Sequence, residues 1–202
     1  MFSKIKARFF HKDLRRQYSA GVSLLIGSTL GLLASFVLSI ESLVLAKNSQ
    51  AVLNCDLNSA LSCSAVAHHW SAAIFGFPNS FIGMLTLPVM VTIAVALLAG
   101  AKFPKWFMQA AQLGAVAGLL FAGWMFYMSY VEIGALCPWC LTLDVGMLLI
   151  IFGLTRYNIL LKNISWRGAR RFIDGGYDAF VVVSLVVVMI VAIIAKFGEQ
   201  LF

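Results

Sequence analysis

The sequence predicts an all-α integral membrane helical bundle with five transmembrane helices and an interfacial helix in an outer loop. Only 11% of the 202 residues are charged and 61% are hydrophobic, whereas an ordinary soluble domain carries about 25% charged residues. A bilayer core requires roughly 20 apolar residues per helix. Five stretches reach this length, at about residues 20–46, 79–101, 106–131, 139–161 and 178–197. Any chemistry must therefore occur inside the bundle or on its short loops.

The positions of the basic residues predict the topology. A net charge of +7 would suit a nucleic-acid-binding protein, but the charges are not spread as such a surface requires. All Lys and Arg residues except Lys47 and Lys196 fall on one side of an alternating five-span model. Because cytoplasmic loops are enriched in Lys and Arg, we expect a plasma (inner) membrane protein with a cytoplasmic N-terminus. Its surroundings are then membrane lipid, and nucleic acid is not expected as a partner.

The chain divides by composition into three parts. A basic cytoplasmic segment, 1–19, precedes a four-helix core, 20–161, which is followed by a basic loop and the fifth helix, 162–202. The first apolar run is longer than the roughly 7–15 residues of a signal peptide, so we expect it to be an uncleaved span. In the outer segment 48–78, apolar residues recur at four-residue spacing, which predicts the short interfacial helix.

All four cysteines are predicted to lie at the outer edge of the membrane. Cys55 and Cys63 fall in the outer loop, and Cys137 and Cys140 open the fourth span. Two crossings separate the pairs, so their convergence favours one shared site in an oxidising compartment. Cys137 and Cys140 form a CxxC motif at a helix N-terminus, where Pro138 suits the first turn. The positive end of the helix dipole favours thiolate there, and thiolate is the reactive form.

Spacing alone leaves other uses of the cysteines open. They could be inert thiols packed as small hydrophobic side chains, or Cys55 and Cys63 could form a purely structural disulfide. Four cysteines also suffice for a zinc site, although a metal at a membrane lip has little to hold together and none is expected. A haem attachment motif would need His after Cys140, and position 141 is Leu. Redox chemistry is the favoured interpretation.

These residues resemble the bacterial form of the vitamin K epoxide reductase family over about residues 20–161. The resemblance rests on the seven-residue spacing of the loop cysteines, Ser62 before the second of them, Asn79 and Ser80 with Gly83 opening the second span, and CPWC opening the fourth. The order of the pairs matters. Disulfide bond formation protein B, an unrelated quinone-linked oxidase, places its CxxC before its loop pair, and this chain has the reverse order.

The resemblance implies a membrane thiol:quinone oxidoreductase with four catalytic cysteines. Cys55 would exchange with a reduced thioredoxin-fold (DsbA-like) protein, and Cys63 would pass electrons to Cys137. Cys140 would then deliver the electron pair to ubiquinone or menaquinone. It further implies that Asn79 binds a quinone carbonyl, with Ser80 beside it; the alternative for Asn79 is a plain helix N-cap. The remaining candidate is Trp139, which either walls the quinone pocket or belongs to the interfacial aromatic belt.

The chain departs from the family pattern in two places. Many relatives carry a fused thioredoxin-like domain after the fifth helix, whereas this sequence ends at Phe202, so we expect a separate extracytoplasmic partner. Animal relatives have a quinone-contacting Tyr four residues after the second CxxC cysteine, and here the residue is Asp144. Asp144 shares a helix face with Cys140, and ionisable groups inside membranes are usually functional. A neutral acid there could donate a proton to the quinone; the alternative is a polar contact with Ser129 or Thr142.

Two other functions compete with thiol oxidation linked to disulfide formation. One is reduction of vitamin K epoxide, the chemistry of animal relatives. The other is a non-catalytic scaffold or small transporter with structural cysteines. A transporter would be expected to show broken helices or midplane charges, and Asp144 is the only strong candidate in the sequence.

Overall fold

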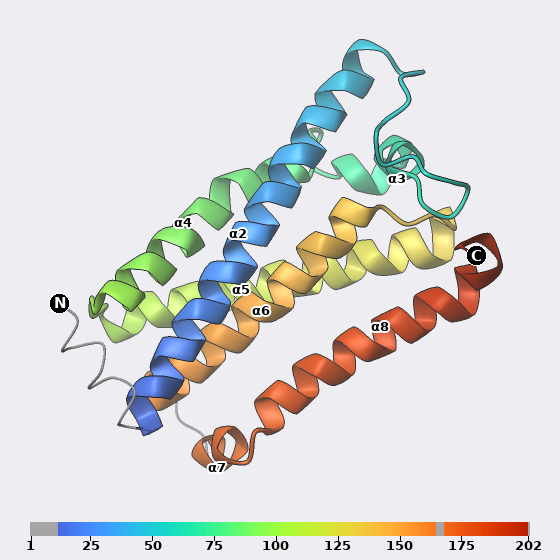
Figure 1. Ribbon diagram of the computed structural model, residues 1–202. Coiled ribbons are helices and arrows are strands. Elements are labelled where there is room, and N and C mark those ends of the chain that lie inside the picture. The colour runs from blue at the N-terminus through green and yellow to red at the C-terminus, as the bar shows by residue number, and fades with distance from the viewer. Residues whose placement is uncertain (1–11, 165–167, 202) are drawn as a thin grey trace.

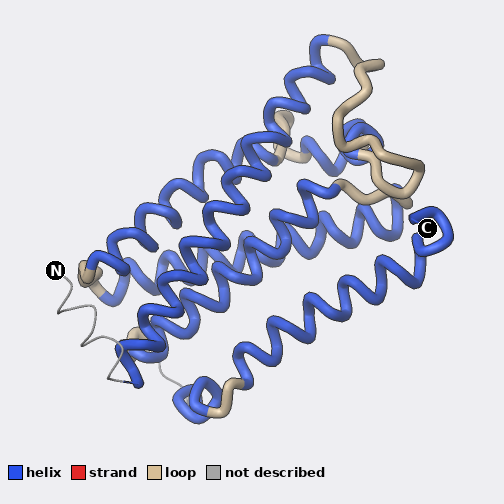
Figure 2. The backbone as a smooth tube through the Cα atoms, viewed as in Figure 1, coloured by secondary structure: helices blue, strands red, loops and turns tan. Residues whose placement is uncertain are grey.

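The computed structural model describes residues 12–164 and 168–201, and these residues are almost entirely helical (Figures 1 and 2). No strand forms in these two ranges; a single isolated bridge pairs Leu61 with Leu136. The elements in chain order are α2 (Lys12–Lys47), α3 (Cys63–His68), η1 (Trp70–Ala73), α4 (Ser80–Ala99), α5 (Lys105–Tyr127), η2 (Met128–Ile133), α6 (Pro138–Leu160), α7 (Ala169–Asp174) and α8 (Tyr177–Leu201).

Five of these helices are long and apolar enough to cross a membrane, which confirms the predicted fold class. Their spans are Asp13–Lys47, Ser80–Ala99, Lys105–Ile133, Pro138–Leu160 and Tyr177–Glu199. Each apolar segment satisfies its own backbone hydrogen bonds as a helix, which is what a hydrocarbon environment demands.

The first helix begins earlier than hydropathy predicts. We expected it from residue 20, but helix α2 starts at Lys12. Two ion pairs explain the extension, because Arg16 pairs with Asp174 and Asp13 pairs with Arg170. Residues 1–11 of the predicted basic segment, and Arg167 of the predicted basic loop, lie outside the described residues.

Helices α2 and α6 form the closest pair in the bundle, and glycines permit the approach. A Cβ atom added at Gly27 would lie 2.6 Å from the Gly146 carbonyl oxygen, and one added at Gly146 would lie 2.8 Å from that of Gly27. About two turns further along α6, a Cβ at Gly153 would lie 2.6 Å from the Ala20 carbonyl oxygen. Helices in lipid associate through such small residues because their backbones can then touch.

The other two core helices lie on opposite sides of this pair. Helix α4 packs along α2, and α5 packs along α6, whereas α4 and α5 scarcely touch each other. At the α2–α4 contact, a Cβ at Gly83 would lie 2.1 Å from Ser35 Oγ, so only glycine fits. The α5–α6 pair is held at its inner end by buried Asn158, whose amide donates to the Met108 carbonyl (3.2 Å) and to Gln112 (3.1 Å). Because α4 and α5 scarcely touch, the four-helix core is open between them.

The fifth spanning helix, α8, lies to one side of the core and is held chiefly at its ends (Figure 1). Near its N-terminus, Arg156 of α6 donates two hydrogen bonds to the Asp178 carboxylate, at 2.6 and 2.9 Å. Near its C-terminus, Phe197 is 2% exposed and packs with Leu136 and Ala60. The short helix α7 precedes α8, where we expected only a basic loop.

The outer segment between α2 and α4 folds over one end of the core. A short helix is present there, as predicted, but it covers 63–68 and continues as the 3₁₀ turn η1. Residues 57–61 are not helical, because the Ser62 N–H donates to the Leu136 carbonyl (2.9 Å) and the Leu136 N–H donates to that of Ala60 (2.8 Å). These two bonds tie the loop to the segment that precedes α6.

The α2–α6 contact predicts which glycine substitution destabilises the bundle. We expect Gly146→Ala to lower the free energy of unfolding by about 1–3 kcal/mol, the usual cost of overpacking. The matched control is Gly123→Ala, because a Cβ at Gly123 meets nothing within 4 Å and alanine should raise helix stability there by up to about 1 kcal/mol. Unfolding of both variants in mixed SDS micelles measures the difference. Equal stability of the two variants would contradict the close approach.

Candidate active site

A single carboxylate organises the loop that carries the first cysteine pair. Asp56 Oδ1 accepts hydrogen bonds from the Ser62 hydroxyl (2.8 Å) and the Ser64 N–H (3.0 Å), and Oδ2 accepts one from the Leu53 N–H (2.9 Å). Ser62 Oγ in turn accepts from the Ala65 N–H (3.2 Å), which caps α3. The loop therefore wraps around the Asp56 side chain.

These hydrogen bonds stabilise the charged form of Asp56. Partial burial acts to raise its pKa, but hydrogen bonds from the Ser64 and Leu53 backbone and from the Ser62 and Ser64 hydroxyls lower it by more, so the net shift is downward. Hydrogen bonds donated to a carboxylate favour the charged form. The loop is consequently held by a charge-assisted network at neutral pH.

The loop cysteines, Cys55 and Cys63, are joined by a disulfide, while Cys137 and Cys140 are free thiols. Cys137 is the N-cap of α6, as its motif predicts, and its Sγ accepts a hydrogen bond from the Cys140 N–H (3.4 Å). The two pairs meet sulfur to sulfur, because Cys63 Sγ lies 3.0 Å from Cys137 Sγ. All four cysteines thus come together at one end of the bundle.

A cavity of about 600 Å³ opens beneath this cluster, within the usual size range of small-molecule sites. Its walls are mostly apolar and come from α2, α4, α5 and α6. The predicted site residues that line it are Cys63, Cys137, Cys140, Asn79, Ser80 and Asp144. Cys55 is not among the lining residues.

The cavity wall carries polar atoms that lack partners. Among the described residues, three buried side-chain oxygens or nitrogens have no hydrogen-bond partner: Ser35 Oγ, Glu41 Oε2 and Asn79 Oδ1. All three residues line this cavity. An unpaired buried polar atom costs about 1–3 kcal/mol, so their convergence fits a cavity that takes a ligand with polar groups.

Asn79 occupies the N-cap position of α4 but does not cap it. Its backbone is already helical (φ −59°, ψ −26°), whereas a capping residue is normally extended. The side chain turns away instead, donating to the Ser71 carbonyl at 2.6 Å, with its Nδ2 also 3.6 Å from Met125 Sδ. The amide therefore has one N–H close only to a sulfur atom and an oxygen without a partner, which suits a ligand with a carbonyl or hydroxyl group.

The other residues predicted to contact the cofactor are Ser80, Asp144 and Trp139, and only the first two line the cavity. Ser80 lines the cavity and is hydrogen-bonded to Ser39 (2.9 Å). Asp144 lines it one helical turn below Cys140, and the alternative partner Thr142 donates its hydroxyl to the Pro138 carbonyl instead (2.9 Å). Trp139 is not a lining residue, since it packs against the cluster that contains the loop disulfide. Its contact with a quinone stays a prediction.

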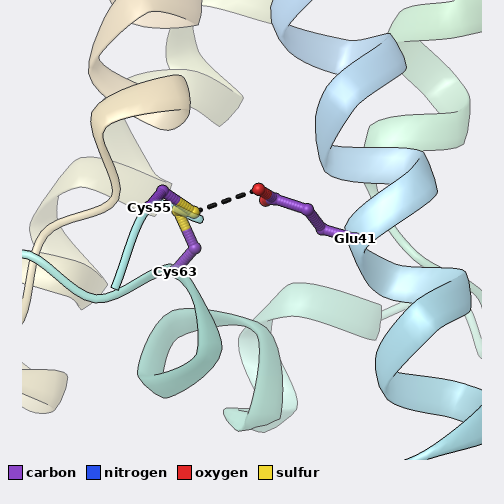
Figure 3. Close-up of side chains that lie close together, drawn as sticks. All are labelled: Glu41, Cys55 and Cys63. Carbon is purple, nitrogen blue, oxygen red and sulfur yellow. Dashed lines mark hydrogen bonds between the residues drawn. A yellow bond between two sulfur atoms is a disulfide. The ribbon is translucent and has the colours of Figure 1, made fainter. Parts of the chain in front are cut away.

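Glu41 of α2 belongs to the site, although its sequence position was not singled out. One carboxyl oxygen, Oε1, lies 3.1 Å from Cys55 Sγ (Figure 3), and the residue also lines the cavity. The rule that identified Asp144, an ionisable residue inside an apolar span, would have identified Glu41 as well. The side-chain atoms of Glu41, Cys55 and Cys63 that could bind a metal ion lie within 4.8 Å of one another. The two sulfur atoms are bonded to each other in the disulfide, however, so they are not available as thiolate ligands.

Comparison with known protein families identifies the family to which the sequence is similar. The sequence matches the family described as the vitamin K epoxide reductase family over residues 22–155. This range contains all four cysteines, the whole of α4 and α5, and most of α2 and α6. Comparison with curated proteins gives no significant match.

The Asp56 network predicts how the loop responds to acid. Because the folded-state pKa is lowered, the stabilisation is present above the unfolded-state pKa and is lost as pH falls through the folded one. Protection of the Leu53 and Ser64 amides in hydrogen exchange, corrected for intrinsic rates, should be constant from pH 5 to 7. It should fall below about pH 4.

Asp56→Asn should remove the loop's protection at neutral pH. Hydrogen bonds to a charged group contribute about 1.5–3 kcal/mol, so we expect the two amides to exchange about 10- to 100-fold faster at pH 7. Glu132→Gln, which neutralises an exposed carboxylate at the same end of the molecule, serves as the control and should exchange like wild type. An acid-insensitive wild-type loop would rule out the role given to Asp56.

Proposed function

The chain belongs to the vitamin K epoxide reductase family, and we propose that it reoxidises a secreted thioredoxin-fold disulfide donor and passes the electrons to a quinone. Family membership and five apolar helices make it a multi-pass membrane oxidoreductase with a disulfide. The observation that carries the finer proposal is the 3.0 Å approach of Cys63 Sγ to Cys137 Sγ, directly above the cavity that Cys140 lines.

The first half of the relay reduces the loop pair. A thiolate of the donor attacks Cys55, which breaks the Cys55–Cys63 bond and releases Cys63 as thiolate. The second thiol of the donor then closes the donor's own disulfide and releases Cys55. The donor is oxidised by two electrons, and the loop cysteines hold them. The exposed side chains of Val52 and Leu57 flank Cys55 and offer the donor a surface to engage.

The second half moves the electrons inward. Cys63 attacks Cys137 of an oxidised Cys137–Cys140 pair, forming a mixed disulfide and releasing Cys140. Cys55 then attacks Cys63, which restores the loop disulfide and releases Cys137. The result is a loop disulfide above two free thiols, the redox state seen in the structure.

The cavity residues then serve the transfer out of the relay. A quinone bound in the cavity would accept two electrons and two protons, while Cys137 and Cys140 close their disulfide. Asn79 would hold and orient its carbonyl group through the amide, with Ser80 alongside. Asp144, one turn deeper than Cys140, would supply a proton inside the apolar wall.

The charge distribution supports an orientation for this relay. With the basic residues on the cytoplasmic side, the N-terminus is cytoplasmic and the cysteine cluster faces the extracytoplasmic space of the plasma membrane. A donor that forms disulfides in secreted proteins works in that compartment. Membrane lipid surrounds the exposed apolar faces of α4, α5 and α8.

Cysteine variants separate the two ends of the relay. In purified protein with a reduced thioredoxin-fold donor and a soluble quinone, Cys140→Ala should abolish quinone reduction with every thiol donor. Cys55→Ala should abolish it with the protein donor but retain turnover with a small dithiol, which can reduce Cys137–Cys140 directly. Optical loss of the oxidised quinone measures both. If wild type and both variants behave alike, the cysteines are structural and the scaffold interpretation replaces this proposal.

Two cavity variants distinguish binding from proton supply. Asn79→Ala should raise KM for the quinone about tenfold with little change in kcat, since a hydrogen bond contributes about 1 kcal/mol or slightly more. Asp144→Asn should instead lower kcat by about 100-fold, the lower range for general acid catalysis, and should flatten the pH dependence of kcat.

The matched control for these variants is Asn48→Ala. Asn48 lies in the exposed loop after α2, and its side chain accepts a local hydrogen bond from the Gln50 N–H, so both kinetic parameters should stay at the wild-type values. An Asp144→Asn enzyme with unchanged kcat and pH profile would show that Asp144 is a polar packing residue.

A further inference from the structure

Glu41 stands at the reacting sulfurs with no role in the relay described so far. Its Oε1 atom is 3.1 Å from Cys55 Sγ, and its Oε2 atom is buried without a partner (Figure 3). A disulfide sulfur has no proton to donate, so a hydrogen bond across this contact must come from the carboxylic acid. Helix α2 holds the carboxyl group rigidly in place, because Glu41 lies in its outer part, six residues before its end.

We propose that Glu41 is the general acid–base catalyst of the loop disulfide, taking the proton from the Cys55 thiol as it closes the bond to Cys63. This role rests on the proposed thiol:quinone function and adds a fifth reacting residue to it. Because the carboxyl group contacts the sulfur that gains or loses the proton, it is placed for catalysis rather than for positioning another residue.

The step balances without any further reactant. The Cys55 thiol gives its proton to the Glu41 carboxylate, and the Cys55 sulfur attacks Cys63 within the Cys63–Cys137 mixed disulfide. The Cys55–Cys63 bond forms, the Cys63–Cys137 bond breaks, and the electron pair leaves on the Cys137 thiolate. In the reverse direction the Glu41 acid protonates Cys55 as it departs, and this is the arrangement of acid and sulfur that the structure contains.

The surroundings of Cys55 explain why a base is needed there. Cys55 is only 6% exposed and packs in an apolar cluster with Leu45, Leu53 and Val66, so water cannot readily remove its proton. Even a free cysteine is only a few per cent thiolate at pH 7. A carboxylate on the adjoining helix supplies the base that solvent does not.

Other titratable groups approach Glu41 from each packed element, and the test must separate them. They are Asp56 and the two loop cysteines from the outer loop, His68 from α3, where it lines a neighbouring pocket with Ser42 and Leu45, and Cys137, Cys140 and Asp144 from α6. None of these groups has a described hydrogen bond to Cys55 Sγ through an oxygen or nitrogen atom, whereas Glu41 does.

The test follows closure of the loop disulfide without quinone. Protein carrying both disulfides is mixed with one equivalent of the reduced thioredoxin-fold donor, quenched at intervals with acid and an alkylating reagent, and mapped by non-reducing peptide mass spectrometry. In Glu41→Gln, which keeps the size of the side chain but cannot take the proton, the Cys63–Cys137 mixed disulfide should accumulate. Closure should be about 100-fold slower than wild type at pH 7.

The pH dependence separates catalysis from a merely structural effect. The defect of Glu41→Gln should shrink to less than about tenfold at pH 9, because the thiolate fraction of Cys55 rises with pH without help from a carboxylate. Glu41→Asp, which keeps the acid, should be slowed by only about tenfold at pH 7 with the same pH trend. Glu132→Gln, the same substitution at an exposed glutamate, should close at the wild-type rate.

The outcomes distinguish this inference from the proposed function. Wild-type protein with the loop disulfide and two CPWC thiols is mixed with a soluble quinone; failure to oxidise those thiols would overturn the proposed function itself. If the quinone is reduced but Glu41→Gln closes its loop disulfide at the wild-type rate, only the role of Glu41 is overturned. A defect of equal size at pH 7 and pH 9, not relieved in Glu41→Asp, would likewise overturn it.

Discussion

The backbone contact between α2 and α6 is the constraint on which the site depends. Gly27 and Gly146 bring the two helices so close that a methyl group would not fit between them. Helix α6 carries the CPWC thiols at its N-terminal end, and α2 carries Glu41, whose carboxyl group contacts the loop disulfide. Fixing these helices at backbone distance fixes where thiols and carboxyl group stand relative to one another. Side-chain packing replaces the hydrophobic driving force that lipid cannot provide.

The outer loop supplies the second half of the geometry. Backbone hydrogen bonds between Ser62, Ala60 and Leu136 join the loop to the start of α6, and the Asp56 carboxylate gathers the turns on either side of the disulfide. Two segments more than seventy residues apart along the chain therefore present their sulfurs at 3.0 Å. Neither the cavity nor the sulfur contact depends on helix α8, which is attached mainly at its ends.

Hydropathy and charge predicted the five spans because each apolar segment must form its own helix in lipid, whatever its neighbours do. The convergence of the cysteines was predictable for a similar reason, since topology alone places both pairs at one membrane surface. The early start of α2 was not predictable, because it depends on ion pairs of Asp13 and Arg16 with residues near 170. The alternative that Asn79 caps α4 is wrong, because the backbone of residue 79 is already helical, which the local sequence does not specify. Glu41 could have been identified from the sequence, because it is an ionisable residue inside an apolar span, as Asp144 is; its contact with the loop disulfide could not.

The gap between α4 and α5 determines how a lipophilic molecule can reach the cavity. Leu85, Val89 and Gly114, all on lipid-exposed parts of these helices, also line the cavity, so the cavity wall continues directly into the bilayer. A lipophilic molecule that enters there never crosses water, and its effective concentration is its mole fraction among the lipids rather than its amount per volume of cell. Adding lipid to the membrane would therefore lower the occupancy of the cavity by that molecule, whereas diluting the suspension with buffer would leave it unchanged.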